Sequence, residues 1–368
     1  MNKKTLVIFI PSIESGGVEK NLFIISNYLA NNLLTKIVLI TSEVKIIKNL
    51  FNKKITIISP LKIFRTNSRK VKFYLSLFLL LFYYIKNKNF IVLSFQANIY
   101  AIFLCKILGI KVLARSNSSP VGWSSNLIKK LIFRYLLNLA DKVIVNSLDF
   151  KKIIDREFLI NSSLILNPFD RTFCKKQSKK KTNIKFFKNS KKILKIINVG
   201  RLTDQKDHLT LLKAITIIKD KIPLKLIIIG QGLNKNLLEN FVRNRNLSHN
   251  VKLIGYKKNS LNFINKSDLF ILSSRYEGLP NVLLEAICLK KFVISSNCST
   301  GPREILSDGK GGLLFKVGDE YDLANKILYF YNNQHKLKKK IIYAYQKLSR
   351  YNYKINLEKY LNLINKFI

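Results

Sequence analysis

Short apolar runs alternate with longer amphipathic segments along almost the whole chain, and this alternation constrains the fold more than any other feature. The runs are rich in Ile, Leu and Val, which is typical of strands buried on both faces of a parallel sheet. In the first half we expect strands at Thr5–Ile10, Lys36–Thr41, Lys54–Ile58, Ile91–Phe95, Lys111–Ala114 and Lys142–Asn146. We expect helices at Gly17–Ala30, Lys72–Ile85, Ile99–Leu108, Ser125–Leu139 and Asp149–Glu157. This order predicts a doubly wound α/β domain with helices on both faces of its sheet.

The same rhythm starts again after residue 193. We expect strands at Leu194–Val199, Lys225–Ile229, Val251–Leu253, Leu269–Leu272 and Phe292–Ser295. Helices are expected at Leu209–Asp220, Asn236–Arg245 and Pro280–Leu289, followed by a mostly helical tail from Tyr321 to Ile368. A chain of 368 residues is also too long for one ordinary core. We therefore expect two Rossmann-like domains that face a cleft.

The domain boundaries follow from composition. Residues 1–170 form the first domain, and residues 171–192 form a Lys-rich linker, with nine lysines between Cys174 and Lys192. Residues 193–345 form the second domain, and residues 346–368 form a C-terminal helix that packs back on the first. Ligands of such sheets bind at the carboxyl ends of the strands, which is where we look for the site.

The formal net charge of +44 leaves two interpretations open. A basic nucleic-acid-binding protein would carry such a charge, but the excess of Lys and Arg is spread through both halves and no helix-turn-helix or zinc motif accompanies it. A compositional bias toward Lys, Ile and Asn along the whole chain is the favoured explanation of the charge. Either way, a basic surface attracts the anionic leaflet of a membrane, so we expect a membrane partner and no nucleic acid.

The apolar run Phe73–Ile85 also allows two interpretations. Its thirteen residues are too few for a membrane span, which needs about 20. It is either a strongly buried helix or a helix that rests on the membrane, with Arg69, Lys70 and Lys72 beside it.

Two observations favour a cytoplasmic protein. The four cysteines (Cys105, Cys174, Cys288 and Cys298) lack the spacing of metal ligands, so we expect reduced thiols and no metal. The apolar start of the chain ends at Pro11 and reads as a first strand, not as a signal peptide.

Two glutamates flank the start of one predicted helix. Glu277 follows the strand Leu269–Leu272, and Glu285 lies in the helix that we expect to begin at Pro280, where a missing N–H costs nothing. Between them the N–H groups of Asn281, Val282 and Leu283 are expected to point out of the helix start, which favours an anion. Carboxylates on either side of a phosphate site suit a sugar nucleotide.

Two further loops carry suitable groups. Gly16 and Gly17 follow the first strand and open a helix, which indicates either a close approach to a ligand or a tight turn. Arg201 and Lys206 follow the first strand of the second domain and place two cations at the expected cleft, where Arg grips phosphate as a fork and Lys acts as a point charge.

Together these motifs resemble glycosyltransferase family 4. The resemblance rests on Gly16-Gly17-x-Glu19, Gly200-Arg-Leu-x-x-Gln-Lys206, Glu277-Gly-Leu-Pro-Asn-x-x-x-Glu285, Gly301-Pro-Arg-Glu304 and Gly312-Leu-Leu-Phe, with Asn146-Ser147 and Asn167-Pro168. It covers nearly the whole chain and is tightest from Leu194 to Ala324. It implies the GT-B fold and sugar transfer with retention, of the kind that builds capsule, O-antigen or lipid-linked oligosaccharides.

The resemblance also implies roles for residues. Glu277 would bind hydroxyls of the donor sugar, and Glu285 those of the ribose. Arg201 and Lys206 would neutralise the diphosphate, so that no metal or other cofactor is needed. Gly16 and Gly17 would let the first domain approach the donor. The backbone of Asn281, Val282 and Leu283 would meet the phosphate.

One departure concerns the acceptor side. Many family members carry a histidine in the first domain, whereas the three histidines here all follow residue 200. The nearest polar groups at predicted strand ends are those of Ser94, Gln96, Arg115 and Asn117, which we take as acceptor-side candidates. No residue is assigned to proton transfer.

The sequence thus predicts a retaining, metal-independent glycosyltransferase. It would move a hexose or N-acetylhexosamine from a nucleotide sugar, a UDP-sugar by preference, to a saccharide or polyprenyl-linked acceptor. It would act in cell-surface polysaccharide synthesis at the inner face of the membrane. The alternatives are another reaction of a GT-B enzyme on a sugar nucleotide, such as epimerisation, and a basic nucleic-acid-binding protein.

Overall fold

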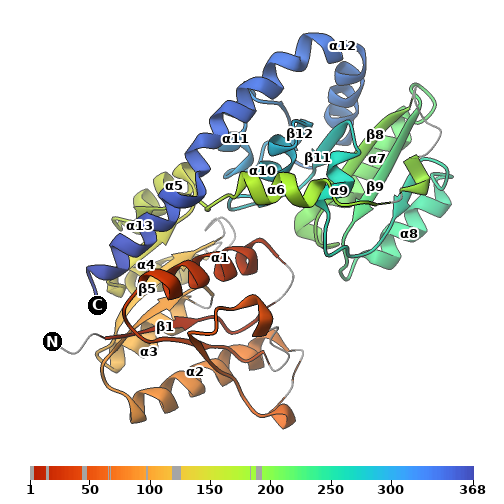
Figure 1. The fold of residues 1–368 in the computed structure, drawn as a ribbon. Coiled ribbons are helices and arrows are strands. Elements are labelled where there is room, and N and C mark those ends of the chain that lie inside the picture. The colour runs from red at the N-terminus through yellow and green to blue at the C-terminus, as the bar shows by residue number, and fades with distance from the viewer. Residues whose placement is uncertain are drawn as a thin grey trace. The chain divides into compact units, whose positions relative to one another are not determined.

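The structure, a computed structural model, divides into two compact units. It describes residues 4–13, 16–43, 48–64, 66, 68–96, 98–117, 126–182, 184–187 and 193–368. Unit 1 comprises Met1–Pro168 and Tyr353–Ile368, and unit 2 comprises Phe169–Asn352 (Figure 1). The chain therefore leaves unit 1 after Pro168 and returns to it at Tyr353, so that the last helix completes the first unit.

The sheet of unit 1 has seven strands in the order β3-β2-β1-β4-β5-β6-β7, and each pair is parallel. Its strands are β1 (Thr5–Phe9), β2 (Ile37–Ile40), β3 (Ile55–Ile58), β4 (Phe90–Ser94), β5 (Lys111–Ser116), β6 (Lys142–Val145) and β7 (Ser163–Leu164). In the central register Val7 lies opposite Val38 on one side and Val92 on the other. Apolar residues in consecutive positions fit this sheet because both of its faces are covered.

Helices cover the two faces of this sheet. They are α1 (Gly17–Asn32), α2 (Arg69–Lys86), α3 (Asn98–Ile107), α4 (Leu127–Leu139), α5 (Leu148–Phe158) and α13 (Tyr353–Asn365). Side chains of α2, α3 and α5 share a core with Val7 and Phe9, whereas those of α1 and α13 share a core with Leu6 and Ile8. This alternation along β1 is the period of two that a strand imposes on its side chains.

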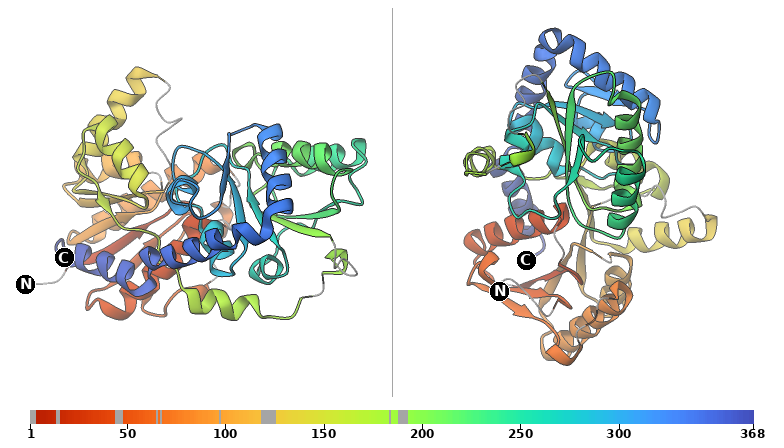
Figure 2. Two further views of the ribbon diagram at one scale, coloured as in Figure 1. Left: turned by 90° about the horizontal axis from the view of Figure 1, so that it is seen from above. Right: turned by 90° about the vertical axis from the view of Figure 1, so that its right-hand side faces the viewer.

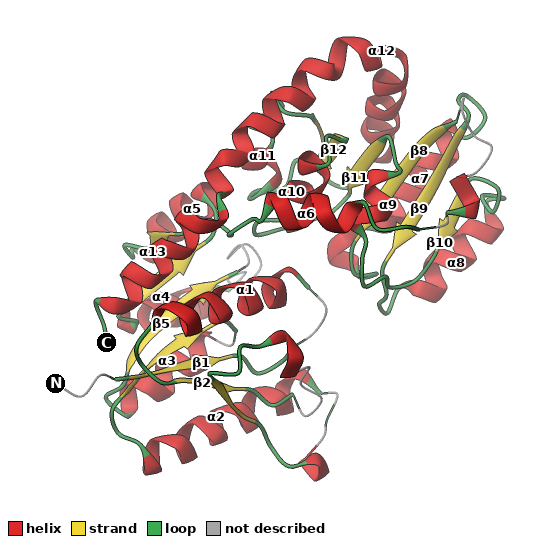
Figure 3. Ribbon diagram, in the orientation of Figure 1, coloured by secondary structure: helices red, strands yellow, loops and turns green. Residues whose placement is uncertain are grey.

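The sheet of unit 2 has six strands in the order β10-β9-β8-β11-β12-β13, again with every pair parallel. Its strands are β8 (Leu194–Val199), β9 (Leu224–Ile229), β10 (Val251–Leu253), β11 (Leu269–Leu272), β12 (Phe292–Ser296) and β13 (Leu313–Phe315). Its helices are α6 (Arg171–Ser178), α7 (His208–Ile218), α8 (Lys235–Asn244), α9 (Leu261–Asn265), α10 (Asn281–Cys288), α11 (Pro302–Ile305) and α12 (Glu320–Lys347). Side chains of α7, α8 and α12 form one core with the sheet, and helices lie on both of its faces (Figures 2 and 3).

Short 3₁₀ turns complete the described elements. They are η1 (Lys48–Leu50), η2 (Lys62–Phe64), η3 (Lys185–Phe187), η4 (Asp204–Lys206) and η5 (Leu348–Tyr351).

Two local expectations differ from the structure. The stretch expected as a linker begins with the helix α6, capped by the Asp170 side chain, which accepts a 2.8 Å hydrogen bond from the N–H of Phe173. Within the expected linker, residues 183 and 188–192 lie outside the described residues. Pro280 is the N-cap of α10 with extended backbone and not its first helical residue, so the helix begins at Asn281.

Within the described part of the chain, no helix has both the length and the apolar character that crossing a membrane requires.

Candidate functional site

The strand order of unit 2 reverses between β8 and β11, and the two loops that leave these strands carry the predicted cations and the first predicted carboxylate. The chain winds from β8 outward to β9 and β10, and then from β11 outward to β12 and β13. In such sheets the crevice at the reversal is the usual ligand site. Gly200, Arg201 and Lys206 follow β8, while Glu277 follows β11.

Lys206 and Glu277 form a largely buried ion pair at this reversal. The ammonium of Lys206 donates to Oε1 of Glu277, and the side chains are 16% and 8% exposed. The hydroxyl of Ser274 donates to the same oxygen over 2.6 Å. A carboxylate so placed has a cation and a hydroxyl on one of its oxygens, in a region of low effective dielectric where charge interactions are strong.

The loop that presents Lys206 is held from both sides. Asp207 adopts the left-handed conformation (φ 45°, ψ 52°) and caps α7, accepting a 2.9 Å hydrogen bond from the Thr210 hydroxyl. Its carboxylate also pairs with Nε of Arg275 at 3.2 Å. The hydroxyl of Ser273 donates to the Lys206 carbonyl over 2.9 Å. The loops after β8 and β11 are therefore tied together, and this fixes the position of Lys206 relative to Glu277.

Glycines let these loops pack closely. A Cβ atom at Gly230, which follows β9, would lie 1.8 Å from the Gly200 carbonyl oxygen. A Cβ atom at Gly301, which has φ +85°, would lie 2.2 Å from the carbonyl oxygen of Gly278. Both distances are far below any real contact. Glycine at 230 therefore allows the loop after β9 to touch the loop after β8, and glycine at 301 allows the loop after β12 to touch the loop after β11.

Glu285 lies on α10, just over one helical turn beyond the helix start, and is 6% exposed. Of the three N–H groups predicted to meet a phosphate, that of Leu283 is already occupied, because it donates to the Pro280 carbonyl over 3.0 Å. The reason is the N-cap position of Pro280, whose carbonyl points into the first turn. In this structure the N–H of Leu283 is thus engaged within the first turn, while Asn281 and Val282 begin the helix.

Arg201 lies exposed in the same loop as Lys206, directly after Gly200. Its carbonyl accepts a 2.9 Å hydrogen bond from the N–H of Thr203, which turns the chain back toward η4. A Cβ atom at Gly200 itself would lie 3.4 Å from Cγ of Lys206, which is an ordinary contact. The two cations predicted for a diphosphate thus share one loop, with one exposed and one buried.

Two other titratable groups near the pair are held in their neutral forms. Burial, together with the smaller effect of the Lys206 charge, lowers the pKa of His208 to about 4. Neither ring nitrogen has a hydrogen-bond partner among the described residues. Burial raises the pKa of the Cys298 thiol to about 12, and the Glu277 carboxylate acts in the same direction. At neutral pH the folded chain therefore carries a neutral imidazole and a neutral thiol at these two positions.

Unit 1 has its own reversal, between β1 and β4, and the acceptor-side candidate Gln96 lies there. Oε1 of Gln96 accepts a 3.4 Å hydrogen bond from the N–H of Ser12, which follows β1. Nε2 of Gln96 donates over 3.4 Å to Glu19, a buried carboxylate in the first turn of α1. Gly16 is the N-cap of α1 and Gly17 its first residue, and a Cβ at Gly16 would lie 2.7 Å from Oε2 of Glu19.

The side chains of Ser94 and Asn117 form hydrogen bonds with neighbouring residues at the ends of β4 and β5. Ser94 is fully buried, and its hydroxyl lies 2.8 Å from Oδ1 of Asn98, to which it donates. The amide of Asn117 donates to the Phe95 carbonyl over 2.6 Å. These bonds hold the loops after β4 and β5 together, so Ser94 has a structural role in this state.

Arg115 is fully buried and does not present its guanidinium to solvent. Its Nε donates to the Tyr360 hydroxyl over 2.8 Å, and its Nη2 donates to Oδ1 of Asn167 over 2.9 Å. The guanidinium also lies over the ring of Phe95, 5.2 Å from the centroid. Arg115 thus connects β5 to the last residues before unit 2 and to α13 after it.

The sequence did not assign roles to several residues that support the two reversals. They are Ser12, Glu19, Asp207, Ser273, Ser274, Arg275 and Thr300, whose hydroxyl donates to the Glu277 carbonyl. Their position directly after a predicted strand, or in the first turn of the next helix, is the signal that could have identified most of them.

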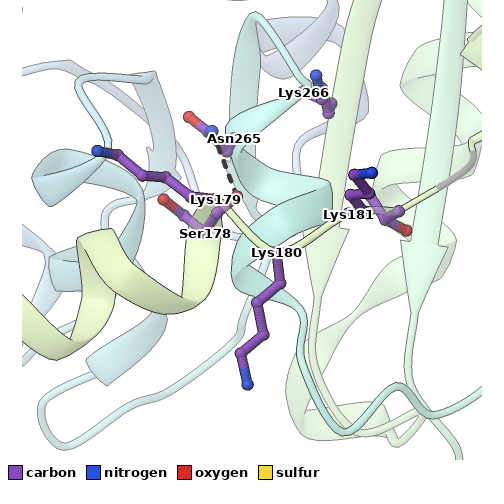
Figure 4. A pocket seen from close by; sticks show the side chains of 7 residues that line it. Ser178, Lys179, Lys180, Lys181, Asn265 and Lys266 are labelled. Atoms are coloured by element: carbon purple, nitrogen blue, oxygen red, sulfur yellow. Dashed lines mark hydrogen bonds between the residues drawn. The ribbon is translucent and has the colours of Figure 1, made fainter.

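Neither a metal cluster nor a cavity competes with this site in the described residues. No group of three or more His, Cys, Asp or Glu side chains that could hold a metal ion occurs among them. A surface cavity of about 700 Å³ lies between the end of α6 and α9, lined by Ser178, Lys179, Lys180, Lys181, Thr182, Asn265 and Lys266 (Figure 4). Its lysine side chains spread away from one another into solvent, and it contains none of the predicted site residues.

With this geometry in hand, the chain can be compared with known proteins. Residues 179–348 match the family model of glycosyl transferases group 1. These residues include the whole Lys206–Glu277 site and Glu285.

Two curated relatives are similar over part of their length. An uncharacterized glycosyltransferase of Methanocaldococcus jannaschii is 35% identical over 222 residues, which cover 58% of this chain and 52% of the relative. A Campylobacter jejuni protein is 34% identical over 125 residues, 34% of each chain. Its name is N-acetylgalactosamine-N,N'-diacetylbacillosaminyl-diphospho-undecaprenol 4-alpha-N-acetylgalactosaminyltransferase. The chain spans about half or less of the length of these relatives.

Solved structures resemble the chain along its whole length. Anabaena HepE in complex with UDP and glucose has a TM-score of 0.79 at 16% identity, covering 98% of this chain and 99% of that one. Staphylococcus aureus TarM, in a complex that contains UDP, has a TM-score of 0.76 at 16% identity, covering 98% and 100%. The chain has the GT-B fold, with two Rossmann-like parallel-sheet domains, which confirms the fold class expected from the sequence.

Proposed function

We propose that the chain is a retaining glycosyltransferase that uses a nucleotide sugar as donor. The observation that carries the proposal is the buried Lys206–Glu277 pair at the β8/β11 reversal, with Glu285 on the helix that follows. A cation and two carboxylates at one sheet edge match the chemistry of a diphosphate joined to two hydroxyl-bearing sugars. The match of residues 179–348 to glycosyl transferases group 1 supports the same assignment.

In this proposal Lys206 and Arg201 bind the diphosphate and stabilise the charge that develops as the nucleotide leaves. Oriented cations in a water-poor site are the largest single source of such stabilisation. Lys206 exchanges part of its contact with Glu277 for the phosphate, which frees the carboxylate to accept hydrogen bonds from the donor sugar. Glu285 binds the ribose hydroxyls. The acceptor hydroxyl attacks from the face that the nucleotide leaves, so the anomeric configuration is kept.

The donor and acceptor are assigned by chemistry and likeness. A UDP-sugar is favoured because HepE, which has the same fold, is solved with UDP-glucose. A hexose or N-acetylhexosamine and a saccharide or polyprenyl-linked acceptor are favoured by the name of the Campylobacter relative. Such an acceptor places the protein at the cytoplasmic face of a membrane, in cell-surface polysaccharide synthesis. Charge neutralisation by Lys206 and Arg201 requires no metal, so turnover should persist in a chelator.

A donor screen followed by a product assay tests the proposal. UDP-, GDP- and ADP-hexoses are compared by thermal shift, where a ligand at 100 times its Kd adds about 2.7 kcal/mol to stability. The favoured donor is then incubated with and without a diphospho-polyprenyl saccharide. We expect nucleoside diphosphate and a glycosylated product of unchanged anomeric configuration only when acceptor is present. A new nucleotide sugar formed without acceptor would instead identify an epimerase.

A further inference from the structure

Three neighbouring helices of unit 1 carry an apolar outer surface. Helices α2, α3 and α4 are adjacent in the order α2-α3-α4, and each sends side chains into the same core beneath one face of the seven-stranded sheet (Figure 1). That inner side accounts for only part of their apolar residues. We call the opposite side of these three helices the outer face.

On α2 the outer face is a continuous stripe. Val71, Tyr74, Phe78, Phe82 and Ile85 are between 44% and 64% exposed. They follow one another at intervals of three or four residues, so they occupy one side of the helix. The buried residues of α2, such as Leu80 and Tyr83, lie between them in sequence and face the sheet. The helix expected at Phe73–Ile85 is therefore apolar on both sides.

The stripe continues across α3. Tyr100, Phe103 and Ile107 are between 49% and 65% exposed and again lie at intervals of three and four residues. The ring of Tyr100 lies 6.5 Å from that of Tyr74 on α2. The exposed residues of the two helices therefore meet in one surface.

On α4 more than half of the apolar side chains are exposed, while Phe133 and Leu139 pack against the core beneath. Leu137 is the buried residue of this thirteen-residue helix. Ile128, Leu131, Ile132 and Tyr135 are between 49% and 67% exposed. A helix that packs only against its own unit would bury such a stripe, so its exposure indicates a partner.

The charges around the outer face have one sign. Helices α2, α3 and α4 contain no Asp or Glu. Arg69, Lys70, Lys129 and Arg134 are exposed, and the ammonium of Lys86 lies 4.6 Å from the ring centroid of Phe82. Three further lysines of these helices pair with acidic residues of neighbouring segments, Lys72 with Glu43, Lys106 with Asp141 and Lys130 with Glu157.

We propose that the outer face of α2, α3 and α4 is a docking surface for an anionic lipid bilayer. The helices lie in the interface with their aromatic and aliphatic side chains among the acyl chains and their Lys and Arg side chains at the phosphates. Charge complementarity argues for lipid, because an isologous contact with a second copy would bring together the five exposed Lys and Arg side chains of these helices from each chain, with no acidic residue on the same helices. In the described part of unit 2 the exposed apolar residues are distributed among loops and several helices, so they form no comparable stripe there.

This proposal goes beyond the transferase assignment, because vesicle binding requires no sugar and no turnover. The two proposals can therefore fail separately.

The test is co-sedimentation of the full chain with vesicles of phosphatidylcholine alone or with phosphatidylglycerol added. One variant removes two aromatic and two aliphatic residues of the outer face by the substitutions Tyr74→Ser, Phe78→Ser, Leu131→Ser and Ile132→Ser. Its control removes equally exposed residues of unit 2 by Tyr256→Ser, Tyr321→Ser, Leu237→Ser and Ile342→Ser. All eight side chains are exposed, so both variants keep their cores.

A second pair of variants separates local charge from the overall charge of the chain. The outer-face variant carries Arg69→Gln, Lys70→Gln, Lys129→Gln and Arg134→Gln. Its control carries Lys257→Gln, Lys258→Gln, Lys336→Gln and Lys338→Gln, which are exposed in unit 2. Each variant loses four positive charges.

We expect binding to vesicles with phosphatidylglycerol that weakens with added salt, and much weaker binding to phosphatidylcholine alone. Each outer-face variant should lose affinity, by about fivefold per charge removed in the charge variant, while both controls bind as the native chain does. Equal losses in the controls would overturn the proposal, as would equal binding to both lipids. A concentration-dependent dimer that dissociates in the apolar outer-face variant, with no vesicle binding, would assign the surface to a second copy instead.

Discussion

Removing one partner of the Lys206–Glu277 pair should destabilise unit 2, and removing both should restore most of the loss. In Lys206→Met the Glu277 carboxylate stays buried, at 8% exposure, with the Ser274 hydroxyl on one oxygen. Breaking a fully buried pair costs about 3–5 kcal/mol, and the 16% exposure of Lys206 reduces this to about 2–4 kcal/mol. In Glu277→Gln the ammonium can turn to water, so we expect about 1–2 kcal/mol. The double variant has no buried charge left and should lose about 1 kcal/mol.

The coupling energy between the two sites is then about 2–5 kcal/mol, measured by urea unfolding of the four proteins. The surface pair Lys213–Glu320, with 3.4 Å between its charged atoms and side chains 46% and 24% exposed, is the control. The same cycle there, with Lys213→Met and Glu320→Gln, should give less than about 1 kcal/mol. Additive losses at Lys206 and Glu277 would refute the reasoning that the two charges depend on each other. Sugar transfer should stay lost in the double variant, because both groups are needed for the donor.

Three further predictions concern other parts of the site. The pKa of His208 lies near 4 in the folded chain and near 6.5 in the unfolded chain, so the unfolded state binds more protons in acid. The stability that the neutral His208 contributes to the folded state is therefore complete above pH 6.5 and is lost as the pH falls toward 4. Urea unfolding at pH 7 and at pH 4 gives the difference in free energy of unfolding between the two pH values, and His208→Leu should make this difference smaller by about 3 kcal/mol. The same difference in the variant and in wild type would contradict the prediction. Glu285→Gln should weaken nucleotide binding about tenfold or more by calorimetry, while the control Glu239→Gln on α8, whose side chain is 41% exposed, should not. Equal affinities of Glu285→Gln and wild type would exclude the ribose role. Gly301→Ala should lower stability by more than 1 kcal/mol, and by more than Gly318→Ala, which has a similar φ but open space around it.

The sequence predicted the strands that consist of continuous apolar runs, and it missed those whose pairing depends on distant residues. β7 has two residues and β13 has three, and each is formed by its pairing with an already buried neighbour. Helix α6 lies in a Lys-rich stretch whose composition favoured a loop. It is held by tertiary contacts with α9 and α10, which local composition does not report.

The candidate site was predictable where topology decides it. Lys206 and Glu277 are 71 residues apart, yet both follow central strands, so the doubly wound order brings them together. Arg115 was predicted to follow a strand and to face a ligand, but it lies within β5. It is buried because Tyr360, 245 residues away, and Asn167 close over it, and no local pattern could indicate that contact.

The most direct test of the central claim measures release of nucleoside diphosphate from the donor sugar nucleotide in the presence of acceptor. Wild type, Glu277→Gln, Lys206→Met and the control Glu239→Gln are compared at saturating donor. If the paired residues bind the donor and stabilise the leaving diphosphate, the first two variants lose about 10²–10³-fold in turnover and the control loses nothing. Turnover in Glu277→Gln and Lys206→Met equal to that of wild type would contradict the account.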